Sequence, residues 1–335
     1  MLQLSQRPLS GSSVDQALFI NRARELDELR RAVRHRFNVL LLGDRGAGKT
    51  SLLRRLAFDL NRETRSIEVI DATAAQDAMA VIDLVEANLG LPPLGDDAAE
   101  RLHHLARGAD ETNVDTIVID GLGDPMIVHQ LFGRLRDELW ELPYRWIVAG
   151  QAESRDRYLT PPADAFFDSI VTLDELSEED AAELLRRRAH AVDPRDEDAA
   201  EVVLGVAVQL ARTITPRQPR HLLAAARDVL VKGEEDPTAW VNNWLGLQVR
   251  ASELGRPAAL LFAELIDLAP VSASDPILLE RMGWTRSRAT QVLRRLEEDG
   301  LVVARTETPD GPGRPRRVYS PNNRYGTFDQ LRRRP

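Results

Sequence analysis

The 335-residue chain contains no cysteine, and no apolar run in it approaches the roughly 20 residues that cross a bilayer. Without cysteine the chain can form no disulfide framework, no zinc finger and no thiol nucleophile. Its N-terminal segment, MLQLSQRPLSGSSVDQ, lacks the basic and apolar regions of a signal peptide. We therefore expect a cytoplasmic protein that does not interact with membranes.

Lysine is almost absent, because Lys49 and Lys232 are the only two and arginine supplies the other basic side chains. A GC-rich coding bias accounts for this preference, and it makes each retained lysine informative. Charge is also uneven: residues 256–335 hold 14 arginines and 10 acidic residues, whereas the whole chain has a net charge of −9. A basic C-terminal part in an acidic protein predicts an anionic partner for that part.

The length predicts two or three domains, and 43% apolar with 29% charged residues is typical of a globular protein. Short apolar runs alternate with helical patterns in the first half, which predicts a doubly wound parallel α/β sheet. The five predicted strands are 38–42, 66–70, 116–119, 146–149 and 169–173. Three helical patterns follow at 177–191, 197–212 and 219–231, and then three helices and a hairpin between 258 and 320, the layout of a winged helix.

The sequence GDRGAGKT, Gly43–Thr50, fits the phosphate-loop pattern in full and lies between a predicted strand and a predicted helix. Backbone N–H groups of such a loop and the helix N-terminus surround phosphates. Lys49 is expected to neutralise the β- and γ-phosphate oxygens, and Thr50 to ligate Mg²⁺. The predicted nucleotide-binding residues here are Gly43, Asp44, Arg45, Gly46, Ala47, Gly48, Lys49, Thr50 and Ser51.

The stretch TIVIDGLGD ends a predicted strand at Asp120, where an aspartate can hold the magnesium ion or its water. Many ATPases of this layout place a second acid directly after that aspartate to activate the attacking water. Here Gly121 stands at that position. The cofactors we expect are ATP or ADP and Mg²⁺.

These motifs resemble those of P-loop ATPases of the AAA+ and STAND groups, including NACHT-like and initiator-like proteins, over roughly residues 19–320. The segment FINRAREL resembles their F-V-G-R-E-x-E-L, which implies that Arg22 borders the nucleotide. Against the NACHT pattern D-G-x-D-E, Asp120 and Gly121 match, and Asp124 takes the place of the glutamate. The resemblance implies that Asp124 activates the water, and slowly, since aspartate is one methylene shorter.

Two further positions follow from the same resemblance. Gln151 ends the fourth predicted strand, where these ATPases carry a polar side chain that reads the γ-phosphate. Pro219 and Arg220 match the proline and arginine of the lid motifs, whose arginine reaches back to the nucleotide. The alternative for Gln151 is a helix cap or a polar loop residue, and the alternative for Arg220 is an arginine on an exposed helix face.

The segment from Trp284 to Leu301 resembles the recognition helix of winged-helix DNA-binding domains, with Thr285 as its N-cap. Its N-terminal end is expected to enter the major groove, and the wing to contact phosphates or the minor groove. The predicted DNA contacts are Arg286, Ser287, Arg288, Thr290, Gln291, Arg314, Arg316 and Arg317. The acidic residues 297–299 are expected at the far end of the helix, away from DNA.

The predicted segments are a flexible N-terminus (1–18), a P-loop ATPase α/β domain (19–174), a helical lid (175–254), a winged helix (255–322) and a basic tail (323–335). One hypothesis is an ATPase whose nucleotide state controls duplex DNA binding or self-association into an oligomer. The alternative is a nucleotide-dependent signalling switch whose winged helix is a structural clamp or binds a protein partner, without DNA.

Overall fold

The computed structural model describes residues 4–5, 7–62, 66–93, 95, 97–108, 112–190, 197–214, 216–232, 246–307 and 316–322. The chain divides into two compact units. The α/β unit comprises residues 7–180 together with Gln218–Arg220, and the C-terminal unit comprises the remainder. The predicted lid and winged helix thus fall within one unit, apart from residues 175–180 and 218–220.

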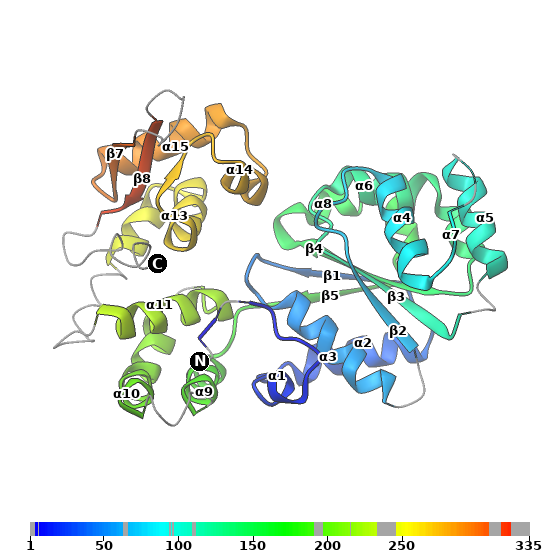
Figure 1. Cartoon of the computed structure of the whole chain (residues 1–335), viewed down its shortest axis with the longest axis horizontal. Helices are drawn as coiled ribbons and strands as arrows, with labels where there is room; N and C mark the ends of the chain where they lie inside the picture. Colours follow the sequence, from blue (N-terminus) through cyan, green and yellow to red (C-terminus); the bar gives the residue numbers. More distant parts are fainter. Residues whose placement is uncertain are drawn as a thin grey trace. The chain divides into compact units, whose positions relative to one another are not determined.

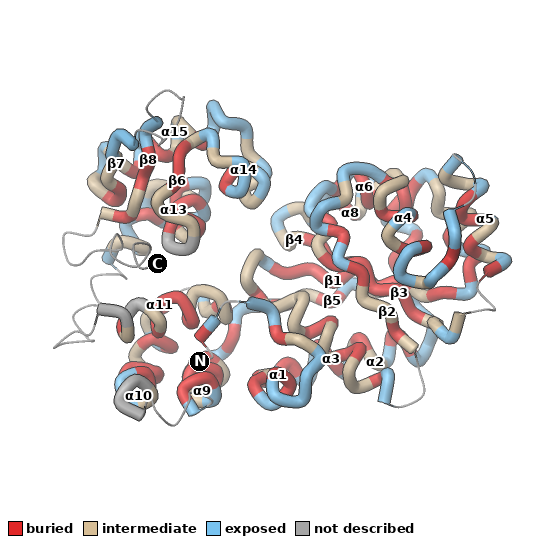
Figure 2. The backbone as a smooth tube through the Cα atoms, in the orientation of Figure 1, coloured by how far each residue is buried: buried red, intermediate tan, exposed pale blue. Residues whose placement is uncertain are grey.

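A five-stranded parallel sheet forms the centre of the α/β unit, in the order β2-β3-β4-β1-β5. The strands are β1 (Val39–Gly43), β2 (Ser66–Asp71), β3 (Val114–Asp120), β4 (Arg145–Gln151) and β5 (Ser169–Leu173). All five residues of β1 are buried, because helices cover both faces of the sheet (Figure 2). The predicted doubly wound parallel sheet is confirmed.

The helices lie in two layers, with α2 and α3 on one face and α4 to α8 on the other (Figure 1). Their bounds are α2 (Ala23–Arg34), α3 (Lys49–Asn61), α4 (Ala78–Leu89), α5 (Ala98–Gly108), α6 (Pro125–His129), α7 (Arg136–Glu141) and α8 (Arg155–Tyr158). A π-helical turn, Gln130–Arg134, separates α6 from α7. Side chains alternate between the two layers along each strand.

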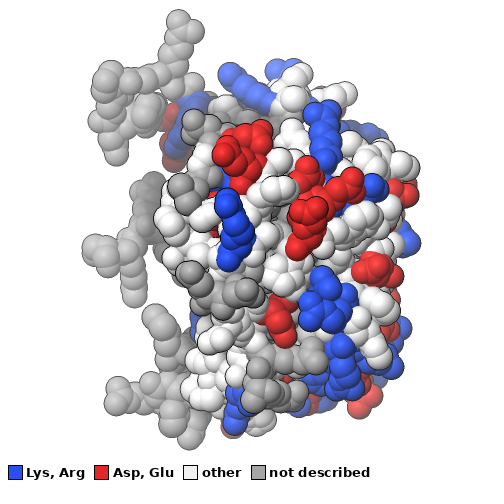
Figure 3. All heavy atoms as spheres, turned by 90° about the vertical axis from the view of Figure 1, so that its right-hand side faces the viewer, with Lys and Arg blue, Asp and Glu red and all other residues white. Residues whose placement is uncertain are grey.

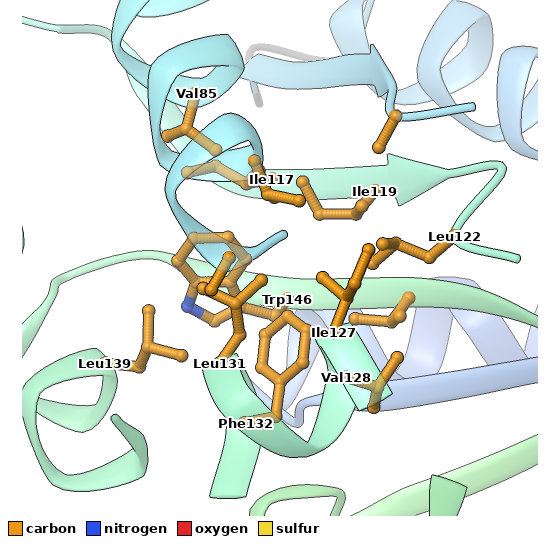
Figure 4. Close-up of a cluster of buried hydrophobic side chains, with 14 of the residues drawn as sticks. Val85, Ile117, Ile119, Leu122, Ile127, Val128, Leu131, Phe132, Leu139 and Trp146 are labelled. Atoms are coloured by element: carbon orange, nitrogen blue, oxygen red, sulfur yellow. The ribbon is translucent and has the colours of Figure 1, made fainter. Parts of the chain in front are cut away.

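The larger core cluster lies between the sheet and α4 to α8. Figure 4 shows Trp146 and Phe132 among aliphatic side chains, and their rings meet edge to face with centroids 5.8 Å apart. Ile117 and Ile119 of β3 point into this cluster, whereas Val118 points into the cluster beneath α2 and α3. Residues of β3 therefore alternate faces up to Asp120.

The N-terminal segment, for which the sequence predicts flexibility over residues 1–18, contains the short helix α1 (Ser13–Ala17). The Arg7 guanidinium donates to both carboxylate oxygens of buried Asp15, at 2.5 and 2.8 Å. Arg54 and Arg55 of α3 donate to the backbone carbonyls of Leu9 and Gln16. These bonds fix residues 7–18 along α3.

The C-terminal unit contains α9 (Glu178–His190), α10 (Glu197–Thr213), α11 (Pro219–Lys232) and a helical stretch over residues 246–253. Its last part runs α13 (Arg256–Leu268), β6 (Val271–Ser272), α14 (Pro276–Met282), α15 (Arg286–Glu298), β7 (Val302–Glu307) and β8 (Arg316–Pro321). The strands form an antiparallel sheet in the order β6-β8-β7, and β6 is too short to stand out in the sequence. This is the element order of a winged helix, and the hairpin tip lies outside the described residues. None of the helices within the described ranges is long and apolar enough to cross a bilayer.

Candidate nucleotide site

The phosphate loop joins the carboxyl end of β1 to the first turn of α3. Gly46 and Gly48 have φ of +84° and +99°, a left-handed conformation that favours glycine. Ala47 N–H donates to the Asp44 carbonyl at 3.2 Å, which closes a turn inside the loop. The chain therefore curls so that the N-terminus of α3 opens towards the space inside the loop.

Lys49 reaches back across this loop from the first position of α3. Its Nζ donates to the Gly43 carbonyl at 2.6 Å and to the Asp44 carbonyl at 3.1 Å. Burial lowers the pKa of the Lys49 ammonium to about 8, while Asp120 and Asp44 act in the opposite direction. A bound anion would offset this cost of burial, because it supplies negative charge beside the ammonium.

Thr50 and Asp120 come together from different elements, as the sequence predicts. Asp120 is buried at the end of β3, and the side chains of Thr50 and Lys49 lie near its carboxylate. Burial raises the pKa of Asp120, and Thr50 and Lys49 counteract this effect. Within the described ranges no cluster of three or more His, Cys, Asp or Glu side chains could hold a metal ion. A metal at this site would depend on Thr50, Asp120 and oxygens of a ligand.

Gly121 turns the chain sharply after Asp120, with φ of +84°. A Cβ at this position would lie 2.3 Å from Thr73 Oγ1 and 3.1 Å from the Thr73 backbone nitrogen. The loop after β2 therefore occupies the space that a side chain would need here. A second acidic residue directly after Asp120 is excluded on steric grounds.

Asp124, the predicted water-activating residue, lies exposed at the start of α6. Its Oδ1 accepts a hydrogen bond from Met126 N–H at 2.8 Å, so its carboxylate caps that helix. Asp124 influences the electrostatic environment of Tyr158, and it is not among the groups that shift Lys49 or Asp120. A role for Asp124 in hydrolysis stays a prediction.

Gln151 lies directly beside Gly43, because β4 pairs with β1 in parallel register. Its backbone N–H donates to the Tyr158 hydroxyl at 3.2 Å, and that hydroxyl donates to the Leu122 carbonyl at 3.3 Å. A Cβ on Gly150 would lie 2.6 Å from the Tyr158 ring. Tyr158, which sequence reasoning missed, therefore fixes the end of β4 against the chain that follows β3.

Arg22 and Ser51 also lie next to the loop. Arg22 is buried, and its guanidinium donates to Glu25, to the Asp174 carbonyl at 2.7 Å and to the Ala47 carbonyl at 3.5 Å. Ser51 Oγ accepts a hydrogen bond from Leu9 N–H at 3.1 Å. Arg22 braces the loop through backbone carbonyls, and Ser51 connects it to the N-terminal segment.

Residues Gln218–Arg220 lie against the phosphate loop, although more than 160 residues separate them from it in sequence. A Cβ on Gly46 would lie 2.8 Å from Arg220 Cβ, and one on Gly48 would lie 3.8 Å from Pro219 Cγ. The predicted proximity of Pro219 and Arg220 to the loop is thus seen. Gln218, which was not predicted, donates from Nε2 to Asp44 at 3.4 Å. Its buried Oε1 has no hydrogen-bond partner among the residues that the structure describes.

The N-terminal half of α15 presents a second polar surface. Thr285 caps the helix by accepting from Arg288 N–H, as predicted. An open hollow of about 800 Å³ runs along the helix, lined by Arg286, Ser287, Thr290, Gln291, Arg294, Arg295 and Glu298. Four of the predicted residues thus share one face. Arg288 does not line the hollow, because its guanidinium stacks 4.7 Å from the Trp284 ring centroid.

Glutamate side chains lie beside several basic residues of α15 and β8. Glu298, the last residue of α15, lines the same hollow as Arg294 and Arg295. On β8, Arg316 pairs with Glu307 at 3.3 Å and Arg317 pairs with Glu297 at 2.5 Å. Arg314 lies outside the described residues.

Comparisons with known proteins agree with this geometry. Residues 31–158 match the family AAA_22, described as an AAA domain. No curated protein matches the chain in sequence. Among solved structures, the Orc1 protein of Aeropyrum pernix in complex with DNA is similar at 17% identity, over 91% of this chain and 90% of that one, with a TM-score of 0.52.

A Walker-type ATPase of Pyrococcus abyssi is similar at 17% identity, over 96% of this chain and 97% of that one, with a TM-score of 0.50. Likeness at such low identity shows the fold and not the activity. The chain therefore has the fold of a P-loop NTPase, and its residues 31–158 are similar to AAA domains.

Proposed function

We propose that the α/β unit binds ATP or ADP at the phosphate loop and hydrolyses ATP slowly. The observation that carries this proposal is the loop itself, in which Lys49 Nζ lies 2.6 Å from the Gly43 carbonyl beside the left-handed Gly46 and Gly48. Backbone N–H groups and a buried ammonium are the donors that a polyphosphate requires. Gln218 and Arg220 add polar groups at the same loop, and the buried Gln218 Oε1 has no partner within the described ranges.

The residues present also fit a magnesium ion. Thr50 lies near enough to influence the Asp120 carboxylate, and Mg²⁺ is usually held by one or two protein oxygens together with substrate phosphates. Mg²⁺, when bound, would neutralise phosphate charge. Thr50 and Asp120 would hold it or its water, while Lys49 would hold the terminal phosphates.

We further propose that the hollow on α15 binds duplex DNA and that nucleotide state controls this binding or self-association. The hollow gathers Arg286, Arg294 and Arg295 with hydroxyl and amide groups, which suit contacts to phosphates and base edges. By contrast, the face seen in Figure 3 shows acidic and basic side chains interspersed. The similar Orc1 protein is known in complex with DNA, which supports the proposal at the level of fold.

Salt-dependent binding to a short duplex tests the DNA proposal. Arg286→Ala and Arg294→Ala should each weaken binding about tenfold, and together they should reduce the slope of log K against log salt by about 2. Arg34→Ala, which removes the same charge from an exposed position on α2, is the matched control. If the protein does not bind the duplex at low salt, with or without Mg–ATP, the DNA-binding proposal is contradicted.

The ion pairs of β7 and β8 favour a second candidate, a nucleotide switch whose C-terminal elements form a structural clamp or bind a protein. Arg316 and Arg317 already pair with Glu307 and Glu297, so contact with phosphate would have to displace these carboxylates. This candidate predicts nucleotide binding without DNA binding. The duplex experiment therefore separates the two.

A further inference from the structure

The carboxylate that Gly121 cannot provide is available on the neighbouring strand. Strand β2 ends at Asp71, and its parallel register with β3 pairs Asp71 with Asp120. Ile67 and Val69 point towards α3, as Val118 does, whereas Ile70 points to the opposite layer with Ile117 and Ile119. By strict alternation, Asp71 and Asp120 both lie on the face of the sheet where α3 begins.

Backbone and side-chain contacts hold the end of β2 against the end of β3. Ala72 N–H donates to the Asp120 carbonyl at 2.7 Å, one residue beyond the regular strand pairing. Thr73 then packs where a side chain at position 121 would lie. The loop after β2 and the loop after β3 are therefore packed against each other, and this packing requires a glycine after Asp120.

Asp71 is both oriented and accessible. Its Oδ1 accepts from Thr73 N–H at 3.0 Å and from Thr73 Oγ1 at 2.6 Å. Oδ2 has no hydrogen-bond partner among the described residues, and the side chain is exposed. The charge of Asp71 acts directly on Asp120, which places the two carboxylates in one electrostatic environment.

We propose that Asp71, held by Thr73, orients the water that attacks ATP in this protein. The inference rests on the proposed nucleotide function and assigns the missing acid to β2 in place of Asp124. Asp124 is committed to capping α6 through Met126 N–H, whereas Asp71 presents an oxygen on the face shared with Asp120 and Thr50.

In this reaction the water oxygen forms a bond to the γ-phosphorus. The bond between the γ-phosphorus and the β,γ-bridging oxygen breaks, and its electron pair stays on ADP. One hydrogen of the water remains on the product as hydrogenphosphate, and the other leaves as a proton to solvent. Asp71 Oδ2 accepts a hydrogen bond from the water and directs its lone pair at phosphorus.

Asp71→Asn is the decisive variant, since it keeps the shape and the acceptor for Thr73 but removes the charge. It should lower the ATP turnover rate about 100-fold. Its affinity for Mg–ADP and for Mg–ATPγS should stay within about twofold of wild type. Formation of a stable complex with ADP and aluminium fluoride, which mimics the transferring phosphoryl group with its water, should be lost. Thr73→Val should give a smaller loss, about tenfold in turnover.

Asp77→Asn is the matched control, because Asp77 is an exposed aspartate in the same connection that caps α4 through Ala80 N–H. It should change neither turnover nor complex formation. The proposal is overturned if Asp71→Asn hydrolyses ATP and forms the ADP–aluminium fluoride complex as well as wild type does. It is also overturned if Asp124→Asn loses both properties and Asp71→Asn keeps them. A wild-type protein that binds Mg–ATP but neither hydrolyses it nor traps aluminium fluoride also overturns the role of Asp71 while leaving nucleotide binding intact. A wild type that fails to bind Mg–ATP instead removes the nucleotide function itself.

Discussion

At the scale of single residues, the lack of space around Gly121 determines which carboxylates can lie beside Asp120 in the nucleotide site. The positive φ and the contact with Thr73 are two separate constraints at this position. The packing of the two loops therefore requires a glycine at this position. Its presence in place of an acid is no evidence that ATP hydrolysis has been lost.

Gly121→Ala should destabilise the α/β unit by about 2–5 kcal/mol. The left-handed backbone costs alanine about 1–2 kcal/mol, and the clash with Thr73 adds the strain of overpacking, typically about 1–3 kcal/mol. Hydrogen exchange of the β3 amides in increasing urea measures the change. In a Thr73→Ala background the loss should shrink because the Oγ1 contact is gone, and an equal loss in both backgrounds would contradict this account.

At the scale of elements, the N-terminal segment is folded around one buried carboxylate, and separate hydrogen bonds attach it to α3. Asp15 accepts from Arg7 and from Ser10 N–H, and Ser51 of α3 accepts from Leu9 N–H. Residues 7–18 thus lie along the helix that begins in the phosphate loop.

Acid should release this segment before the sheet unfolds. Hydrogen bonds from Arg7 hold the pKa of the Asp15 carboxyl well below its ordinary value of about 4, and Ser10 adds to the effect. The stabilisation is therefore present above pH of about 4 and is lost as pH falls through the folded-state pKa. Hydrogen exchange of residues 9–18 should accelerate over this range while the strands stay protected.

Asp15→Asn should produce the same release at neutral pH, at a local cost of about 1–3 kcal/mol. Asp27→Asn is its control, since the Asp27–Arg30 pair is an exposed ion pair on α2 and contributes little. Slow exchange of residues 9–18 in Asp15→Asn would mean that other contacts hold the segment.

At the scale of the whole molecule, the sequence predicted the sheet and the phosphate loop because both depend on local patterns. Continuous apolar runs mark buried strands, and the glycine spacing marks the loop. Asp120 could be placed for the same reason, as the end of such a run.

What could not be predicted depends on contacts between distant segments. Gln218 and Tyr158 reach their positions only through the fold, and no local pattern distinguishes them from other polar residues. Asp71 and Thr73 lie beside Asp120 and Gly121 only because of the register between β2 and β3, which the sequence does not reveal. The sequence resemblance pointed to Asp124, since a linear motif cannot show that the neighbouring strand provides a carboxylate.

The central claim is that this chain binds Mg-nucleotide through Lys49, and equilibrium calorimetry with Mg–ATP tests it most directly. The control is Lys232→Ala, which removes the only other lysine of the chain. Wild type and Lys232→Ala should bind with equal affinity, and Lys49→Ala should bind at least about 30-fold more weakly, as expected for the loss of a charge-assisted hydrogen bond of about 2–3 kcal/mol. Equal binding by Lys49→Ala and wild type, or no binding by wild type, would contradict the account.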